Sequence, residues 1–257
     1  MAIVHAHAER FVNLPGFPYA PHFVELDGLR VHYVDEGRGE ILLCLHGEPT
    51  WAYLYRKLIP PFVTAGNRVV APDFIGFGRS DKFTEIEEYS FKLHYQTLES
   101  LIERLDLQKI TLVCQDWGGL IGLTVAANHP DRFARLVIMN TGLPIGEEKM
   151  SDGFMAWRSF ALRTPELVAS MVVRNACETG KNLPPEVLAA YDAPFPDFNH
   201  KAGRHAFPRL VPISPDMGGV AEMKEARRRL AIWNKPALVM FSDATRSRAA
   251  EIVSSGD

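Results

Sequence analysis

Short apolar runs alternate along the chain with longer amphipathic segments, a pattern typical of a mostly parallel sheet with helices on both faces. The apolar runs predict strands over residues 23–26, 29–34, 41–45, 69–71, 110–115, 136–139 and 236–241. The intervening segments predict helices over residues 51–62, 91–105, 119–129 and 221–233. The dipeptide Asp27-Gly28 favours a hairpin between the first two strands, so the sheet is expected to begin antiparallel. The expected fold class is therefore α/β.

The alternation of strands and helices stops after residue 140. Residues 141–216 contain short amphipathic stretches separated by prolines, which indicates an inserted helical cap. The α/β core accordingly comprises residues 1–140 and resumes over residues 217–243. Residues 244–257 show neither a strand pattern nor a helix period, and we interpret them as an aberrant tail.

Composition narrows the classes of function. The 28 Lys and Arg residues against 31 Asp and Glu give a formal net charge of −3, which disfavours binding to nucleic acid or to an anionic membrane. The three cysteines are too few and too scattered for a disulfide framework or a metal cage. No signal peptide is evident, and no apolar run approaches the ~18 residues of a membrane span. We expect a cytoplasmic protein with one core.

Residues 112–119, LVCQDWGG, carry the first chemical signal. A buried strand runs into one polar residue flanked by small ones, and a helix follows directly, which is typical of a nucleophile held on a strained turn. The position of the nucleophile is occupied by Asp116. A carboxylate there attacks a saturated carbon and forms an ester. An aspartate that merely caps the following helix is the alternative.

Residues 46–51, HGEPTW, follow the third predicted strand. In this architecture the loop supplies one backbone N–H of an oxyanion hole, and the residue after the nucleophile supplies the other. Glu48 and Trp117 are therefore the expected donors, whereas His46 is expected to be structural.

Together these segments resemble the haloalkane dehalogenases of the α/β-hydrolase superfamily. The resemblance covers about residues 10–243 and is carried by HGEPTW, by YLYRK at 53–57, by DFIGFGRSD at 73–81 and by the Asp-Trp turn. It implies an α/β-hydrolase fold with a helical cap. It also implies hydrolysis of small haloalkanes to primary alcohol and halide, with water, without a cofactor and without a metal.

The resemblance also assigns roles to residues. Asp116 would displace the halide in line and form an alkyl-enzyme ester, and the indole N–H of Trp117 would bind the departing halide. The second halide-binding indole in this branch comes from the cap, where FMAW at 154–157 followed by RTP at 163–165 matches, so Trp157 would supply it. Trp51 and Trp233 match no such position and are expected to be packing residues.

The end of the sequence departs from the family. The family places an acid after the strand at 236–241 and a histidine before a last helix, but here Thr245 stands where the acid belongs and no histidine follows His205. We hypothesise a frameshift near residue 243, because allowed codons from there, regrouped in another frame, translate as RDPITRGGDRFFRG and restore the family's D-P-I-T. The last strand and helix would then be missing. We expect halide displacement to occur once, ester hydrolysis to stall, and a strand edge to be exposed.

Two other functions stay open. An epoxide hydrolase shares the aspartate turn and the HGxP loop but protonates the epoxide with cap tyrosines, and this cap region contains only Tyr191. A non-catalytic remnant of an α/β-hydrolase is the other alternative, which the absent histidine favours.

Overall fold

The computed structural model describes residues 2–164, 167–177 and 182–242. The predictions concerning the tail at 244–257, Thr245 and the frameshift lie outside the described residues.

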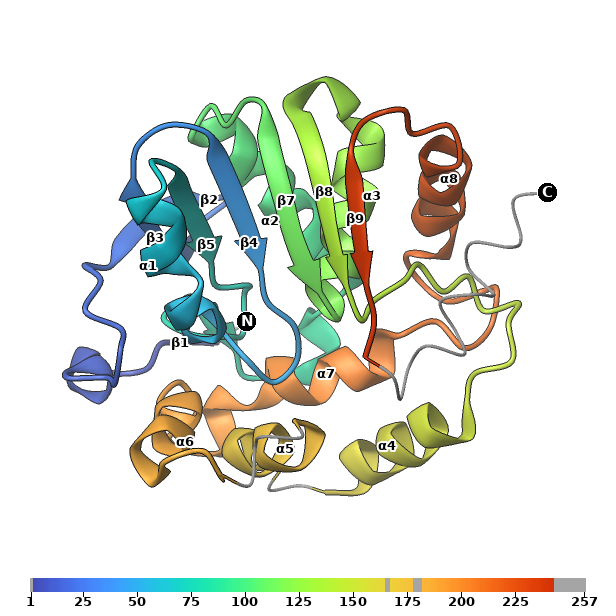
Figure 1. Cartoon of the computed structure of the whole chain (residues 1–257). Helices are drawn as coiled ribbons and strands as arrows, with labels where there is room; N and C mark the ends of the chain where they lie inside the picture. The colour runs from blue at the N-terminus through green and yellow to red at the C-terminus, as the bar shows by residue number, and fades with distance from the viewer. Residues whose placement is uncertain (1, 165–166, 178–181, 243–257) are drawn as a thin grey trace.

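A mixed sheet forms the centre of the molecule (Figure 1). Its strand order is β2-β3-β5-β4-β7-β8-β9. The strands are β2 (His22–Leu26), β3 (Leu29–Gly37), β5 (Arg68–Pro72), β4 (Ile41–Leu45), β7 (Ile110–Gln115), β8 (Phe133–Met139) and β9 (Ala237–Met240). The pairs β2–β3 and β3–β5 are antiparallel and the rest are parallel, which confirms both the expected hairpin and the α/β class.

Helices cover the two faces of the sheet (Figure 1). They are α1 (Ile59–Thr64), α2 (Phe91–Arg104), α3 (Trp117–Asn128) and α8 (Val220–Leu230), of which α2 and α8 each pack against α3. Helix α2 begins where the Ser90 side chain accepts a hydrogen bond from the Leu93 N–H, an N-cap that stabilises its first turn.

The single helix predicted over 51–62 is wrong. That segment divides into a 3-10 helix, η2 (Ala52–Lys57), and the short α1. Pro60 and Pro61 explain the break, because proline lacks the N–H that would continue a helix and is tolerated only in a first turn. The prediction also missed β1 (Ile3–Val4) and β6 (Lys82–Phe83), which pair with each other and are too short to show a period.

A group of α-helices lies beyond the carboxyl ends of the parallel strands (Figure 1). They are α4 (Asp152–Arg163), α5 (Ala169–Ala176), α6 (Pro185–Asp192) and α7 (Ala202–Leu210). The Trp51 indole N–H donates to the Ala190 carbonyl at 3.1 Å, and the Arg158 Nε–H donates to the Pro208 carbonyl at 3.0 Å. The first bond ties α6 to the loop after β4, and the second ties α4 to α7.

Burial of the strands decreases from the centre of the sheet to the edge formed by β9. Strands β4 and β7 are almost wholly buried, as predicted for strands covered on both faces. Strand β9 pairs with β8 at the edge, and its side chains are exposed, with Leu238 at 53% and Val239 at 48%. An apolar, exposed edge strand is a site at which chains associate.

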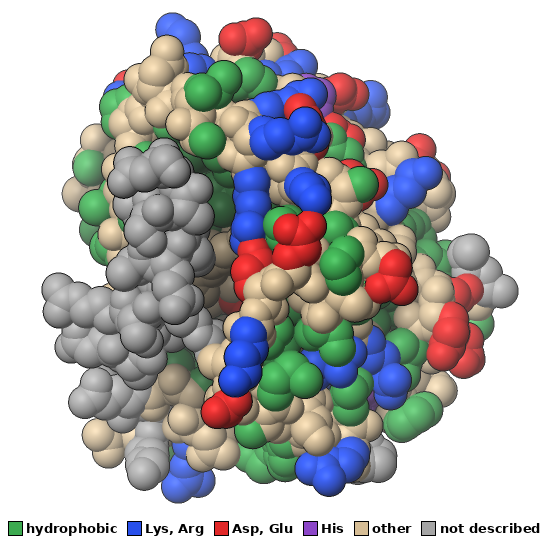
Figure 2. Space-filling model, turned by 90° about the vertical axis from the view of Figure 1, so that its right-hand side faces the viewer, with side chains coloured by type: hydrophobic (Ala, Val, Ile, Leu, Met, Phe, Trp, Pro, Cys, Tyr) green, Lys and Arg blue, Asp and Glu red, His purple; other side chains and the backbone are tan. Residues whose placement is uncertain are grey.

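The face that carries α8 shows acidic and basic side chains side by side (Figure 2). Lys224 pairs with Glu147 at 2.8 Å, and Arg227 pairs with Glu148. Within the described ranges, no helix is long and apolar enough to cross a membrane, and no cluster of three or more His, Cys, Asp or Glu side chains could hold a metal.

Candidate active site

Asp116 lies on the sharp turn between β7 and α3. Its backbone has φ 48° and ψ −128°, which confirms the strained conformation expected for this position. The residues that follow it must be small, because neighbouring atoms leave no room for a side chain. A Cβ on Gly118 would lie 2.2 Å from the Leu45 carbonyl oxygen, and one on Gly119 would lie 2.1 Å from Thr141 Oγ1. The turn therefore holds the aspartate close to β4 and to the segment after β8.

The loop after β4 reaches the carboxylate of Asp116 directly. The Glu48 backbone N–H donates to Asp116 Oδ1 at 2.8 Å, and a second hydrogen bond comes from the Trp117 backbone N–H. A Cβ on Gly47 would lie 2.2 Å from Asp116 Oδ1, so only glycine leaves room for this approach. The structure thus brings the two sequence-predicted N–H donors onto the predicted nucleophile.

Burial opposes the ionisation of the two carboxyl groups in this site, those of Asp116 and Glu48. Burial raises the pKa of Asp116, while the hydrogen bonds from Trp117 and Glu48 lower it. Burial also raises the pKa of the Glu48 carboxyl well above its ordinary value. The Asp116 charge raises it further and Arg204 of α7 lowers it. The sequence indicated a role for the Glu48 backbone only, and not an interaction of its carboxyl with the nucleophile.

Two buried imidazoles lie among the surrounding elements. His46 Nδ1 is 3.0 Å from the Gly47 carbonyl oxygen, and its Nε2 accepts from the Phe74 N–H at 3.0 Å. Both ring nitrogens are occupied by backbone groups, as expected of a structural histidine. His94 of α2 packs edge-on against Phe207 with centroids 4.7 Å apart, and burial lowers its pKa to about 3.

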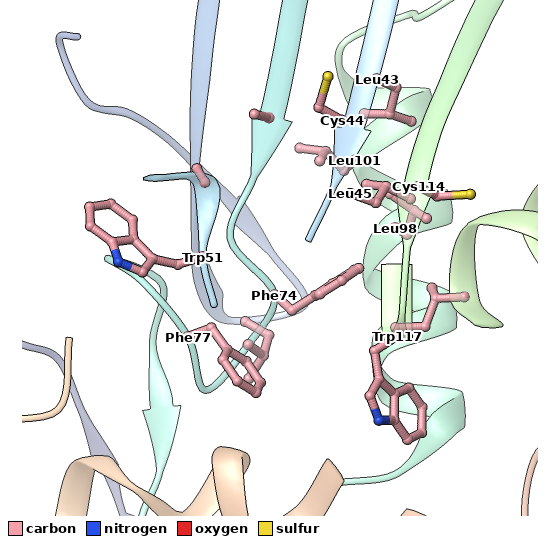
Figure 3. Packing of buried hydrophobic residues seen from close by; sticks show 14 of the residues in the cluster. Leu43, Cys44, Leu45, Trp51, Phe74, Phe77, Leu98, Leu101, Cys114 and Trp117 are labelled. Atoms are coloured by element: carbon pink, nitrogen blue, oxygen red, sulfur yellow. The ribbon is translucent and has the colours of Figure 1, made fainter. Parts of the chain in front are cut away.

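Trp117 begins α3 and its indole points away from the strands, beyond the ends that carry Leu45 and Cys114 (Figure 3). Its ring packs against Phe207 of α7, with centroids 4.4 Å apart. Trp157 lies on α4 and packs against Phe160 of the same helix, with centroids 6.0 Å apart. Between these two predicted halide-binding indoles the described residues show no ring contact.

Asp73 is a buried charged residue for which the sequence indicated no individual role. It lies directly after β5, fully buried, 2.6 Å from His32 Nδ1, and it accepts from the backbone N–H groups of Ala52 and Arg79. Burial opposes its charge, but His32, His46 and the Ala52 N–H together outweigh burial, and the pKa of Asp73 is lowered to about 2. Two features of the sequence could have indicated its importance: Asp73 follows a strand directly, and a glycine, Gly78, comes five residues later. A Cβ on Gly78 would lie 1.9 Å from Asp73 Oδ2.

The cap tyrosine that an epoxide hydrolase would need is engaged elsewhere. Tyr191 Oη accepts from Arg56 Nη1 at 3.0 Å, and its ring packs edge-on against Tyr53. It is buried, with 3% of its surface exposed. This arrangement gives the epoxide alternative no support.

This chain is similar in sequence and in structure to known haloalkane dehalogenases. A family model described as the alpha/beta hydrolase fold matches residues 40–166. A haloalkane dehalogenase of Mycobacterium marinum is 48% identical over 250 residues, covering 95% of this chain and 84% of that protein. One from Psychrobacter cryohalolentis is 43% identical, covering 95% and 82%. The solved structure of a tetrameric haloalkane dehalogenase from Paraglaciecola agarilytica superimposes with a TM-score of 0.91 at 40% identity, covering 98% of this chain and 88% of that one.

Proposed function

The chain belongs to the haloalkane dehalogenases, hydrolases that act on carbon–halide bonds, and we propose that it cleaves small haloalkanes through an alkyl ester on Asp116. One observation carries this proposal: Asp116 sits on a strained turn and its carboxylate receives the N–H groups of Glu48 and Trp117. An ordinary helix cap needs neither the strain nor these donors.

In the first step, a carboxylate oxygen of Asp116 attacks the carbon that bears the halogen. The new C–O bond forms as the carbon–halogen bond breaks, and the bonding electron pair leaves with the halide. The two backbone N–H groups stay on the aspartate. They would stabilise the oxyanion that forms when water attacks the ester carbonyl.

Halide departure needs a donor in apolar surroundings. We assign the Trp117 indole N–H to this role, since its ring is buried against Phe207 and an indole only donates. Trp157 is proposed as the second donor on the strength of its place in the family motif. Residues 141–216 are proposed as the cap that carries it, over a core formed by residues 1–140 and 217–243.

Ester hydrolysis is proposed to be impaired, because of how the structure places the buried histidines in the described part of the chain. The water that hydrolyses the ester needs a base. His46 has both nitrogens bound to backbone groups, and His94 is enclosed by aromatic rings. The alkyl-enzyme is therefore expected to accumulate.

Halide release from purified protein given excess 1-bromobutane tests the proposal. We expect about one halide per chain, released in a burst, and none from Asp116→Asn. A Ser90→Ala variant, changed only at the N-cap of α2, is the matched control and should keep the burst. No burst from the unmodified chain would refute the proposed chemistry, and sustained turnover would refute the proposed impairment.

A further inference from the structure

The Glu48 side chain has surroundings that its backbone role does not explain. Its Oε1 atom is buried and makes no hydrogen bond within the described part of the chain. The backbone nitrogen of the same residue lies 2.8 Å from Asp116 Oδ1, and the Asp116 charge acts on the Glu48 carboxyl. A buried carboxylate oxygen without a donor is costly, because it has lost its water and gained nothing in exchange.

Two adjacent carboxyl groups seldom both ionise. When like charges share a buried site, the pKa of one group rises and that group keeps its proton. Asp116 receives two backbone N–H groups, which favour its charged form, and Glu48 Oε1 receives none. The proton therefore belongs on Glu48 and the charge on Asp116.

Arg204 favours the ionised form of Glu48. It lies on α7, is 1% exposed, stacks over the Phe195 ring at 4.8 Å, and acts electrostatically on Glu48. An ester on Asp116 would remove the like charge that raises the pKa of Glu48, while Arg204 would still favour the Glu48 carboxylate.

We propose that Glu48 holds a proton while Asp116 is ionised and releases it when Asp116 becomes an ester, so that halide displacement liberates a proton as well. This inference rests on the proposed function. The step balances: Asp116 carboxylate and R–X give the ester and X⁻, and the Glu48 carboxyl gives its carboxylate and H⁺, which leaves with the halide. Glu48 is thus a positioning residue that matches the charge of the site to the state of Asp116.

Among the residues that the structure describes, Asp116 and Arg204 are the charged groups that act on Glu48. His46, two residues earlier in the loop, has both nitrogens in hydrogen bonds to backbone groups, and burial lowers its pKa, so it is neutral. The proton of Glu48 therefore responds chiefly to the charge of Asp116.

Direct titration of Glu48 tests this coupling without any turnover. The ¹³Cδ resonance of Glu48, identified by its loss in Glu48→Gln, should show a titration midpoint well above the ordinary 4.5 of a glutamate. Replacing Asp116 by the neutral isostere in Asp116→Asn should lower that midpoint by about 1–3 pH units. A midpoint near 4.5 in the unmodified chain would overturn the inference, even if the Asp116→Asn variant does not fold.

The stoichiometry of the burst provides the second measurement. In weak buffer with a pH indicator at neutral pH, the unmodified chain should release about one proton per halide while mass spectrometry still shows the alkyl-enzyme. Glu48→Gln, which keeps its backbone N–H, should release halide with almost no proton. A halide burst without protons in the unmodified chain would overturn the inference and leave the proposed function standing. Absence of halide would refute the function, and the titration would then decide the inference.

Discussion

Gly47→Ala is the substitution that this geometry penalises most specifically. The added Cβ would lie 2.2 Å from Asp116 Oδ1, 2.4 Å from its Cβ and 2.7 Å from its Cγ. Ordinary contact begins at 3.4 Å, so the carboxylate and the loop must separate by more than 1 Å. Such a shift breaks the 2.8 Å hydrogen bond from the Glu48 N–H and moves the attacking oxygen. A misplacement of this size lowers the rate by about 100-fold.

The assay is rapid-mixing measurement of the halide burst with 1-bromobutane, alongside urea unfolding. We expect the burst rate of Gly47→Ala to fall at least about 100-fold, while overpacking lowers the free energy of unfolding by about 1–3 kcal/mol. Gly218→Ala is the matched control, because nothing lies within 4 Å of its added Cβ, and it should keep the full burst. A Gly47→Ala variant that reacts within threefold of the unmodified chain would refute the placement of Asp116 against this loop.

Three further predictions concern the halide donor, the buried Asp73–His32 pair and the sheet edge. Trp117→Phe removes an N–H bound to an anion, worth about 1.5–3 kcal/mol, and should slow the burst about 10- to 100-fold; an unchanged rate would exclude this donor. Asp73, whose pKa is lowered to about 2 by His32, His46 and the Ala52 N–H against burial, should contribute about 2 kcal/mol above pH 4 and lose it as pH falls toward 2. The unfolding free energy of Asp73→Asn should therefore approach that of the unmodified chain over this interval, and a constant difference would contradict the assignment. Val239→Lys on β9 should reduce light scattering of concentrated protein, since charge on an edge strand opposes association; equal scattering would count against the exposed edge.

Periodicity predicted the sheet well where a strand is buried on both faces. Strands β4 and β7 have the predicted bounds, because a continuous apolar run is stable only where the strand is buried on both faces, at the centre of the sheet. The segment at 51–62 was misjudged because its apolar spacing suits a helix, whereas Pro60-Pro61 decides where a helix can begin. In that segment the two prolines, and not the apolar spacing, determine where the helix begins.

Part of the candidate site could also be predicted from the sequence, and part could not. Asp116 and its strained turn could be predicted, since a polar residue held between a buried strand and small residues is typical of a nucleophile on a sharp turn. The interaction of Glu48 with Asp116 and Arg204 could not, because it joins positions 68 and 88 residues apart in the sequence. No local pattern carries information about such a contact.

The most direct test of the account is the mass of the protein after reaction with 1-bromobutane. We predict a gain of one butyl group per chain, located on the peptide that contains Asp116, in amount equal to the bromide released. Bromide release that stops at about one per chain without any adduct on that peptide, or an adduct that survives in Asp116→Asn, would contradict the assignment of Asp116 as the nucleophile.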